Sequence, residues 1–217
     1  MSESAVSRVD TTEPSETPPE PEGYAAPSEF SYPTVVLVVG AGLLGVASTV
    51  ALVVLLSAVH GPEAFASVYE MTTDGDTMTF AMDLTAIIVP FVVALVVTTV
   101  VHEALHGAAF AHYGYDVSYG VIPSMGAFYT AVFGQFQKRE ELLRVGLAPL
   151  VVITAVCVPL LAVPVPVVAI TAAFVLILNT SGAIGDLYAT WRLARMPPGT
   201  LMYDVDIRHS YVYEPLE

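Results

Sequence analysis

The residues His102-Glu103-Ala104-Leu105-His106 carry side chains whose types and spacing could perform chemistry. On a helix, positions i and i+4 lie about 40° apart on one face, so both imidazoles could bind one Zn²⁺. Zinc lowers the pKa of a bound water, and a glutamate between the two histidines could take its proton as a general base. The pattern therefore predicts His102 and His106 as zinc ligands and Glu103 as the catalytic base of a hydrolase.

The setting of this motif strengthens the prediction. It directly follows an apolar run without any charged residue, Leu84–Val101. Ionisable groups at membrane depth are energetically expensive and usually serve a function. A helix that merely ends in polar residues is the alternative, and it does not explain the spacing of the histidines.

The composition combines features that rarely occur together in a soluble domain. The chain has 217 residues and a net charge of −14, yet 55% of its residues are hydrophobic and only 13% are charged. This combination is typical of a membrane protein with acidic flanking segments. Nucleic acid is excluded as a partner, because no basic patch exists to neutralise phosphates. The lipid bilayer is the expected environment.

The surplus of acidic residues has two possible origins. Lys138 is the only lysine, and seven basic residues stand against 21 acidic ones. This pattern resembles the proteins of halophilic organisms, in which a carboxylate-rich surface stays hydrated at high salt. A simple acidic tail is the alternative.

Long apolar stretches predict an all-α membrane protein with about four transmembrane helices, because one span needs roughly 20 apolar residues. The predicted spans are Thr34–Val59, Leu84–His112, Val145–Val163 and a fourth that begins at Val168 and ends near Asp186. Between the second and third spans, Tyr113–Gly134 is rich in Gly, Tyr, Phe and Val, which predicts a β-hairpin or a re-entrant loop beside the motif. Gln135–Arg144 is charged and is predicted to form a helix at the membrane interface.

These elements divide the chain into three parts. Residues 1–32 are rich in Pro, Glu and Ser, and we expect a disordered acidic tail. Residues 33–191 form the predicted transmembrane domain, which carries the His-Glu-Ala-Leu-His motif. Residues 192–217 form a polar C-terminal tail, which is either extended or loose.

The basic residues predict the orientation in the membrane. The loop 60–83 has neither Lys nor Arg, and with four spans all seven basic residues fall on the opposite side. Because positively charged loops stay in the cytoplasm, we expect a multi-pass protein of the cell membrane with both termini cytoplasmic. The second and fourth helices then run in the same direction, and both end near the cytoplasmic face.

A catalytic zinc of this kind needs a third protein ligand besides water. Asp186 is favoured, since we expect it at the cytoplasmic, C-terminal end of the fourth helix, at the depth of the two histidines. His112 has the spacing of a longer zinc motif, but Ala109 replaces the glycine at which the chain would turn back. Glu140 or Glu141 could serve as in soluble zincins. A site without a third protein ligand also remains open.

The stretch HEALHGAAFAHYGYDV resembles the pattern of the site-2 proteases, and the order of motif helix, hairpin-like loop, Leu-Ala-Pro-Leu span and Asn…Asp span is similar as well. The ending MPPGTLMYDVDIRHSYVYEP resembles a zincin peptidase family of unknown function. Together the two resemblances cover residues 84–217. They imply a membrane zinc metalloprotease whose ligands are His102, His106 and Asp186, with Glu103 as the base and Asn179 as a candidate for substrate contact. Unlike the site-2 proteases, the chain has no proline between Asn179 and Asp186 and no glycine after Asp186.

The function expected from these observations is hydrolysis of peptide bonds in a membrane protein or peptide near the cytoplasmic face. Two other classes remain as alternatives. One is an inactive membrane scaffold or regulator, and the other is a metal-binding sensor or transport module. Glu103 favours the hydrolase, because a purely structural metal site does not need a base.

Overall fold

The computed structural model describes residues 18–122 and 127–216. Within them the chain forms two compact units, each assembled from segments that are separate in sequence. The helical unit comprises Val38–His102 and Leu150–Ile184. The sheet unit comprises the residues up to Leu37, Glu103–Pro149 and the residues from Gly185 onward.

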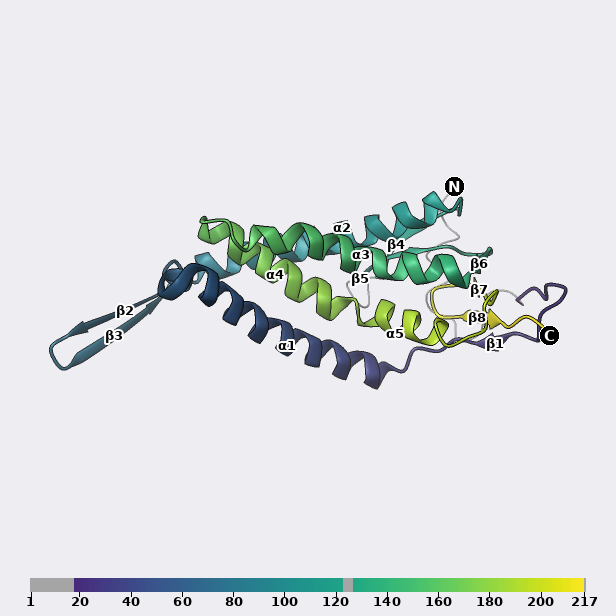
Figure 1. The fold of residues 1–217 in the computed structure, drawn as a ribbon, viewed down its shortest axis with the longest axis horizontal. Helices are drawn as coiled ribbons and strands as arrows, with labels where there is room; N and C mark the ends of the chain where they lie inside the picture. The colour runs from purple at the N-terminus through teal and green to yellow at the C-terminus, as the bar shows by residue number, and fades with distance from the viewer. Residues whose placement is uncertain (1–17, 123–126, 217) are drawn as a thin grey trace. The chain divides into compact units, whose positions relative to one another are not determined.

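Long apolar helices build the helical unit (Figure 1). They are most of α1 (Thr34–His60), the part of α2 (Thr85–His112) up to His102, the second half of α3 (Arg139–Leu160) and α4 (Pro166–Gly182). A helix satisfies its own backbone hydrogen bonds, and this allows an apolar segment to stand in lipid. Among the described residues, Thr34–Phe65, Thr85–His112 and Arg139–Leu160 are each long and apolar enough to cross a membrane. The chain is therefore suited to membrane association.

Local sequence signals fix both ends of α2. The carboxylate of Asp83 accepts hydrogen bonds from the backbone N–H groups of Thr85 and Ala86, at 2.8 and 3.3 Å, and so caps the first turn. At the other end Gly114 takes a φ of 85°, a left-handed conformation in which glycine commonly terminates helices. The helix continues through Pro90 and carries the whole His-Glu-Ala-Leu-His motif.

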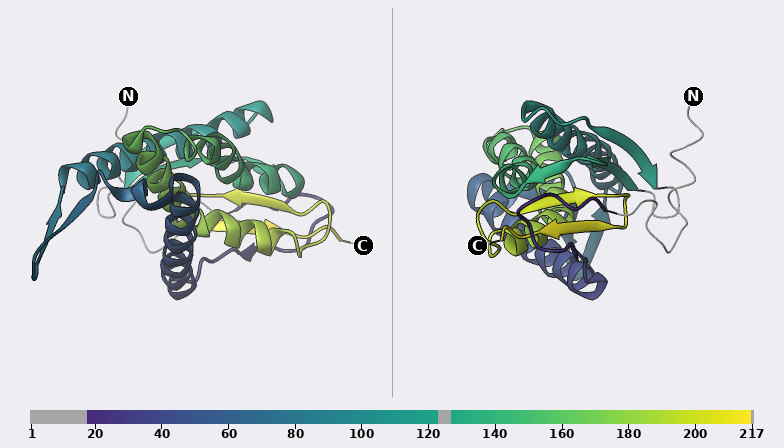
Figure 2. Two further views of the ribbon diagram at one scale, coloured as in Figure 1. Left: turned by 60° about the vertical axis from the view of Figure 1, so that its left-hand side comes forward. Right: turned by 90° about the vertical axis from the view of Figure 1, so that its right-hand side faces the viewer.

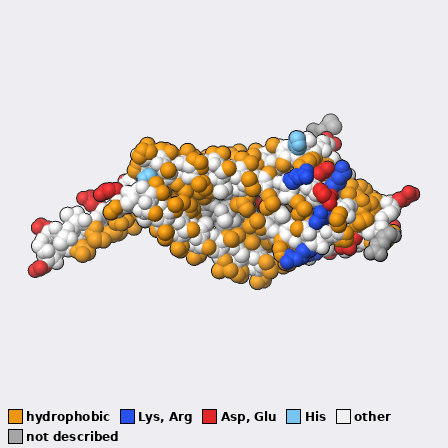
Figure 3. Space-filling view, in the orientation of Figure 1, with side chains coloured by type: hydrophobic (Ala, Val, Ile, Leu, Met, Phe, Trp, Pro, Cys, Tyr) orange, Lys and Arg blue, Asp and Glu red, His pale blue; other side chains and the backbone are white. Residues whose placement is uncertain are grey.

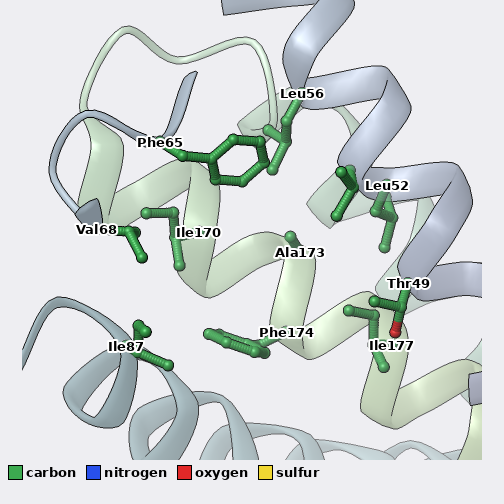
Figure 4. Close-up of a pocket in the computed structure, with 11 residues that line it drawn as sticks. Thr49, Leu52, Leu56, Phe65, Val68, Ile87, Ile170, Ala173, Phe174 and Ile177 are labelled. Atoms are coloured by element: carbon green, nitrogen blue, oxygen red, sulfur yellow. The ribbon is translucent and has the colours of Figure 1, made fainter. Parts of the chain in front are cut away.

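An apolar pocket of about 210 Å³ lies inside the helical unit (Figure 4). Its lining side chains come from α1, α4, the beginning of α2 and the segment after α1. They are Thr49, Leu52, Val53, Leu56, Phe65, Val68, Ile87, Ile170, Ala173, Phe174 and Ile177. Thr49 contributes the single hydroxyl, so the pocket suits apolar groups.

The connection between α1 and α2 is more ordered than a polar loop. A 3₁₀ helix, η2 (Gly61–Phe65), leads into an antiparallel hairpin of β2 (Tyr69–Asp74) and β3 (Thr77–Met82). Gly75 in the two-residue turn has a φ of 57°, as tight hairpin turns require. In Figure 1 this hairpin extends beyond the ends of α1 and α2.

The sheet unit contains a four-stranded antiparallel sheet in the order β1-β8-β7-β6 (Figure 2). Its strands are β1 (Ser28–Glu29), β6 (Phe136–Lys138), β7 (Leu201–Asp204) and β8 (Ser210–Tyr213). Phe30, Leu193, Met202 and Val212 form its core. A separate hairpin pairs β4 (Ser118–Ile122) with β5 (Ala127–Ala131), and α5 (Ile184–Leu193) completes the unit.

The predicted all-α fold class is wrong, because the described residues form a mixed α/β structure with one four-stranded sheet and two hairpins. The count of about four spans is also too high for straight helices. A fourth span would have to be the pair α4 and α5, which is bent by 44° at a break. The helix predicted for residues 135–144 is confirmed only from Arg139, where α3 begins and continues unbroken into the third apolar segment, whereas residues 136–138 form β6.

The two predicted tails contribute strands to the sheet unit. The disorder expected for residues 1–32 falls partly on residues 1–17, which lie outside the described residues. Within residues 18–32, β1 pairs with β8 and the side chain of Phe30 is 1% exposed. The tail from residue 192 contains β7 and β8. The hairpin or re-entrant loop expected within residues 113–134 forms the β4–β5 hairpin.

Candidate metal centre

Both histidines of the motif lie on the C-terminal third of α2. Because α2 is continuous, the two side chains stand one helical turn apart on the same face. His106 is buried, with 8% of its surface exposed, and His102 is half-buried. The helical geometry assumed from the sequence is therefore present.

A main-chain carbonyl sets the tautomer of His106. Its Nδ1 lies 3.1 Å from the carbonyl oxygen of Val145 on α3. A carbonyl oxygen only accepts, so Nδ1 must carry the proton and donate it. Nε2 is then the nitrogen available to a metal, and it faces Asp186, whose Oδ1 lies 3.3 Å away.

Nε2 of His106 and Oδ1 of Asp186 are placed so that both could bind one metal ion. In the tautomer that donates from Nδ1 to Val145, Nε2 has a lone pair to offer such an ion. A nitrogen and a hard carboxylate oxygen are ligands that Zn²⁺ takes in protein sites.

A side chain sets the tautomer of His102. Its Nδ1 lies 3.0 Å from Oδ1 of Asn179, which is fully buried on α4. The amide oxygen accepts this hydrogen bond, so Nε2 of His102 is again the unprotonated nitrogen. Such bonds behind metal-ligating histidines orient the ring and raise its basicity. The structure thus places Asn179 beside the candidate ligand His102, and the substrate contact that the resemblance implied stays a prediction.

His102, His106 and Asp186 together make a group that could hold a metal ion. One ligand atom from each residue lies within 4.8 Å of the others. No other such group of His, Cys, Asp and Glu occurs among the residues that the structure describes. The donor set of two imidazoles and one carboxylate matches catalytic zinc sites, which leave a fourth position for water.

The position of Asp186 differs from the expectation. It lies in the first turn of α5, after the chain breaks at Ala183, and not at the C-terminal end of a span. A carboxylate near a helix N-terminus is stabilised by the helix dipole. Gly146 lets α3 approach this helix closely, because a Cβ there would lie 2.8 Å from Oγ1 of Thr190. The break between α4 and α5 therefore places the Asp186 carboxylate where the dipole of α5 stabilises its negative charge.

The other residues considered as third ligands have different partners. His112 is exposed at the end of α2 and packs against the ring of Tyr113. The Glu140 carboxylate accepts from Arg139 and from the backbone of Gly199. Glu141 accepts hydrogen bonds from the Tyr115 hydroxyl and from Nζ of Lys138. Burial and the hydrogen bond to Glu141 raise the pKa of Tyr115 to about 12, so the hydroxyl remains a donor at neutral pH. These carboxylates join α3 to the loop and sheet around it.

The β4–β5 hairpin packs directly against the motif. The hydroxyl of Thr130 on β5 donates to the backbone carbonyl of Glu103 at 2.9 Å, and the side chain of Glu103 is half-buried. A Cβ on Gly107 would overlap the hydroxyl of Tyr119 on β4, so a larger residue there would displace this exposed side chain. Tyr119, Thr130 and Gly107 were not predicted from the sequence. The one available signal was a glycine immediately after the second histidine.

Residues 95–201 match the model of a protein family described as "Putative zincin peptidase". This stretch is similar to the zincin-like peptidases. It runs from the middle of α2 to the start of β7 and includes both histidines, Glu103 and Asp186. No curated protein and no solved structure matches the chain. The match supports a zinc-dependent peptidase in general, and it does not distinguish a site-2 protease from other zincins.

Proposed function

We propose that this chain is a membrane-embedded zinc metalloprotease that hydrolyses peptide bonds near the cytoplasmic face of the membrane. The observation that carries the proposal is the orientation of both histidines. Each histidine donates a hydrogen bond from Nδ1–H to a fixed acceptor, the side chain of Asn179 or the carbonyl of Val145. Each therefore has Nε2 unprotonated and able to bind an ion. A structural element that only ended a helix would not need this arrangement.

His102, His106 and Asp186 would hold the metal, and their donor types fit zinc. When bound, zinc supplies Lewis acidity that activates water and polarises the substrate carbonyl. Glu103 lies between the two histidines and would take the proton of the attacking water. It would then deliver this proton to the nitrogen of the leaving amine, as a general base that becomes a general acid.

The membrane assignment is supported by the three apolar helices and by the distribution of charge. The segment 61–84 between α1 and α2 has no Lys or Arg, whereas Lys138, Arg139 and Arg144 follow the motif. By the positive-inside rule, the C-terminal end of α2 and the motif belong to the cytoplasmic side. The substrate would be a membrane protein or peptide that reaches this depth. Reporter fusions after Glu70 and at the C-terminus should report opposite sides of the membrane.

The decisive experiment measures metal and cleavage in the same preparations. Full-length protein in lipid nanodiscs should contain about one zinc per chain and should cleave a fluorogenic peptide with an apolar segment. Glu103→Gln should keep the zinc and lose roughly 10²–10⁴ in rate, the usual contribution of a general base. Glu70→Gln, on the distant β2–β3 hairpin, is the matched control and should behave as wild type.

Two outcomes would contradict the proposal. Cleavage by Glu103→Gln at the wild-type rate would remove the enzyme assignment. If the wild type contains stoichiometric zinc but cleaves neither the peptide nor a natural membrane protein, a regulator or sensor would be favoured.

A further inference from the structure

The β2–β3 hairpin has two chemically different faces. Residues directly opposite each other on antiparallel strands share a face, and alternate residues along a strand point to opposite faces. One face, here called the methionine face, is apolar except for one threonine. It consists of the pairs Tyr69–Met82, Met71–Phe80 and Thr73–Met78. The opposite face consists of Glu70–Ala81, Thr72–Thr79 and Asp74–Thr77.

Nothing in the described chain covers the methionine face. All twelve strand residues are exposed, and the large apolar side chains are exposed by 41% to 68% of their surface. Tyr69 and Phe80 stack on each other with ring centroids 5.9 Å apart, but they pack on no third group that would bury them. Figure 3 shows hydrophobic side chains along one side of this hairpin. A two-stranded hairpin alone is marginally stable in water, so a covering surface is expected.

Lipid does not account for this surface. The helices α1 and α2 have 27 and 28 residues, so each is about 40 Å long. That exceeds the hydrocarbon thickness of roughly 30 Å. The hairpin begins beyond these helix ends, and its six-residue strands extend about 20 Å further. The methionine face therefore stands outside the hydrocarbon layer.

The charge of residues 61–84 indicates which kind of protein partner is compatible with the hairpin. Residues 61–84 contain five acidic side chains and no basic one. The acidic residues are Glu63, Glu70, Asp74, Asp76 and Asp83. A second copy would bring two sets of like charges together, which opposes association. Glu70 and Asp74 lie on the opposite face of the hairpin, and Glu63, Asp76 and Asp83 lie just outside its strands. A partner segment with apolar residues on one side and basic residues on the other would therefore complement both faces.

We propose that the methionine face of the β2–β3 hairpin is a docking surface for a basic, amphipathic segment of another protein on the non-cytoplasmic side of the membrane. Three methionines make the surface adaptable, because unbranched thioether side chains repack around different apolar groups. The free strand edges also offer backbone hydrogen bonds to an extended segment. The surface is separate from the metal centre, so its role does not depend on the protease assignment, whereas its side of the membrane rests on the orientation proposed above.

The test uses full-length protein in nanodiscs of neutral lipid and a synthetic peptide that alternates lysine and valine. Binding is followed by fluorescence anisotropy of the labelled peptide. The double variant Met71→Thr/Phe80→Thr removes an opposed pair from the methionine face and keeps residues that favour strands. The matched control, Thr72→Ser/Thr79→Ser, changes the opposed pair on the other face.

Wild type should bind the peptide, and binding should weaken as salt screens the charges. Met71→Thr/Phe80→Thr should bind at least about tenfold more weakly, because two apolar contacts are lost. The serine control should stay within about twofold of wild type, and a peptide with glutamate in place of lysine should not bind. Equal binding by both double variants would overturn the proposal. So would absence of binding by the wild type.

A photo-crosslinking residue in place of Phe80 distinguishes a peptide partner from lipid or a second copy of the chain on the methionine face. In the presence of the lysine–valine peptide it should form a peptide adduct, whereas the same residue at Thr79 should not. Adducts with lipid alone, or with a second copy of the chain, would assign the surface to the membrane or to self-association and overturn the proposal. The experiment can be run on Glu103→Gln protein, so its failure is distinguishable from failure of the protease assignment.

Discussion

Replacing Asn179 by leucine should weaken zinc binding without removing a ligand. Leucine has nearly the same volume but lacks the oxygen that accepts the Nδ1 proton of His102 at 3.0 Å. The site is fully buried, so little water can enter to replace this acceptor. Loss of a hydrogen bond behind a ligand typically lowers metal affinity by about 10–100-fold, or about 1.4–2.8 kcal/mol. We expect a loss in this range for Asn179→Leu.

The assay is competition for zinc between the full-length protein and a chromophoric chelator at fixed pH. Asn179→Asp keeps an oxygen acceptor in the same place, and should bind zinc at least as tightly as wild type. Ser181→Ala is the matched control, because the Ser181 hydroxyl bonds only within α4, to Ile177 at 2.8 Å and to Leu178 at 3.2 Å. It should change the affinity by less than about twofold.

Zinc binding by Asn179→Leu as tight as by wild type, together with weaker binding by Asp186→Ala, would contradict this prediction. In that case the bond to His102 would be a packing feature without influence on the ion. An equal loss of affinity in Asn179→Asp and Asn179→Leu would contradict it as well, because the acceptor oxygen would then not be the cause. Thermal unfolding of the zinc-free variants provides the check that each protein is folded.

Three further predictions concern other residues. Asp186→Ala should lower zinc affinity by more than about 100-fold, the upper limit for groups behind a ligand, whereas His112→Ala should leave zinc content and cleavage nearly unchanged. Gly107→Ala should displace the exposed Tyr119 side chain at little cost, because alanine favours a helix over glycine by about 1 kcal/mol; the unfolding temperature should stay the same or rise, and a clear drop would show that Tyr119 cannot move away. Burial raises the pKa of Asp204, so the folded protein holds this proton more tightly than the unfolded chain and loses stability as pH rises above about 4. Asp204→Asn should therefore raise the unfolding temperature at neutral pH and flatten its pH dependence, and an unchanged profile would refute the assignment.

The helices that carry the metal centre could be predicted from sequence because their signals are long. Thr34–Val59 was predicted as a span and α1 occupies Thr34–His60, and the second span likewise agrees with α2 to within one residue. Over more than 20 apolar residues, one polar substitution changes little in the pattern. The i, i+4 spacing of two histidines is equally robust, since it follows from helix geometry alone.

The strands could not be predicted in the same way. β1 has two residues and β6 has three, which is too short for an alternating pattern to be recognised. Their pairing depends on residues far away in the chain, such as Ser28 beside Val212. The β2–β3 hairpin does alternate, with methionine and aromatic residues on one face, but its acidic residues made the segment resemble a polar loop.

The hydrogen bonds behind the histidines show why part of the site was also out of reach. His106 is oriented by the carbonyl of Val145, and every residue has a carbonyl, so no residue type in the sequence marks this contact. His102 is oriented by a side chain, but Asn179 is 77 residues away, and its partner is fixed only by the packing of α4. The ligands could therefore be named from their chemistry, whereas their tautomers depend on tertiary structure. It follows that a change of residue type can probe the His102 contact directly. The His106 contact can be altered only by moving α3, and a variant that lacks it would also disturb the fold.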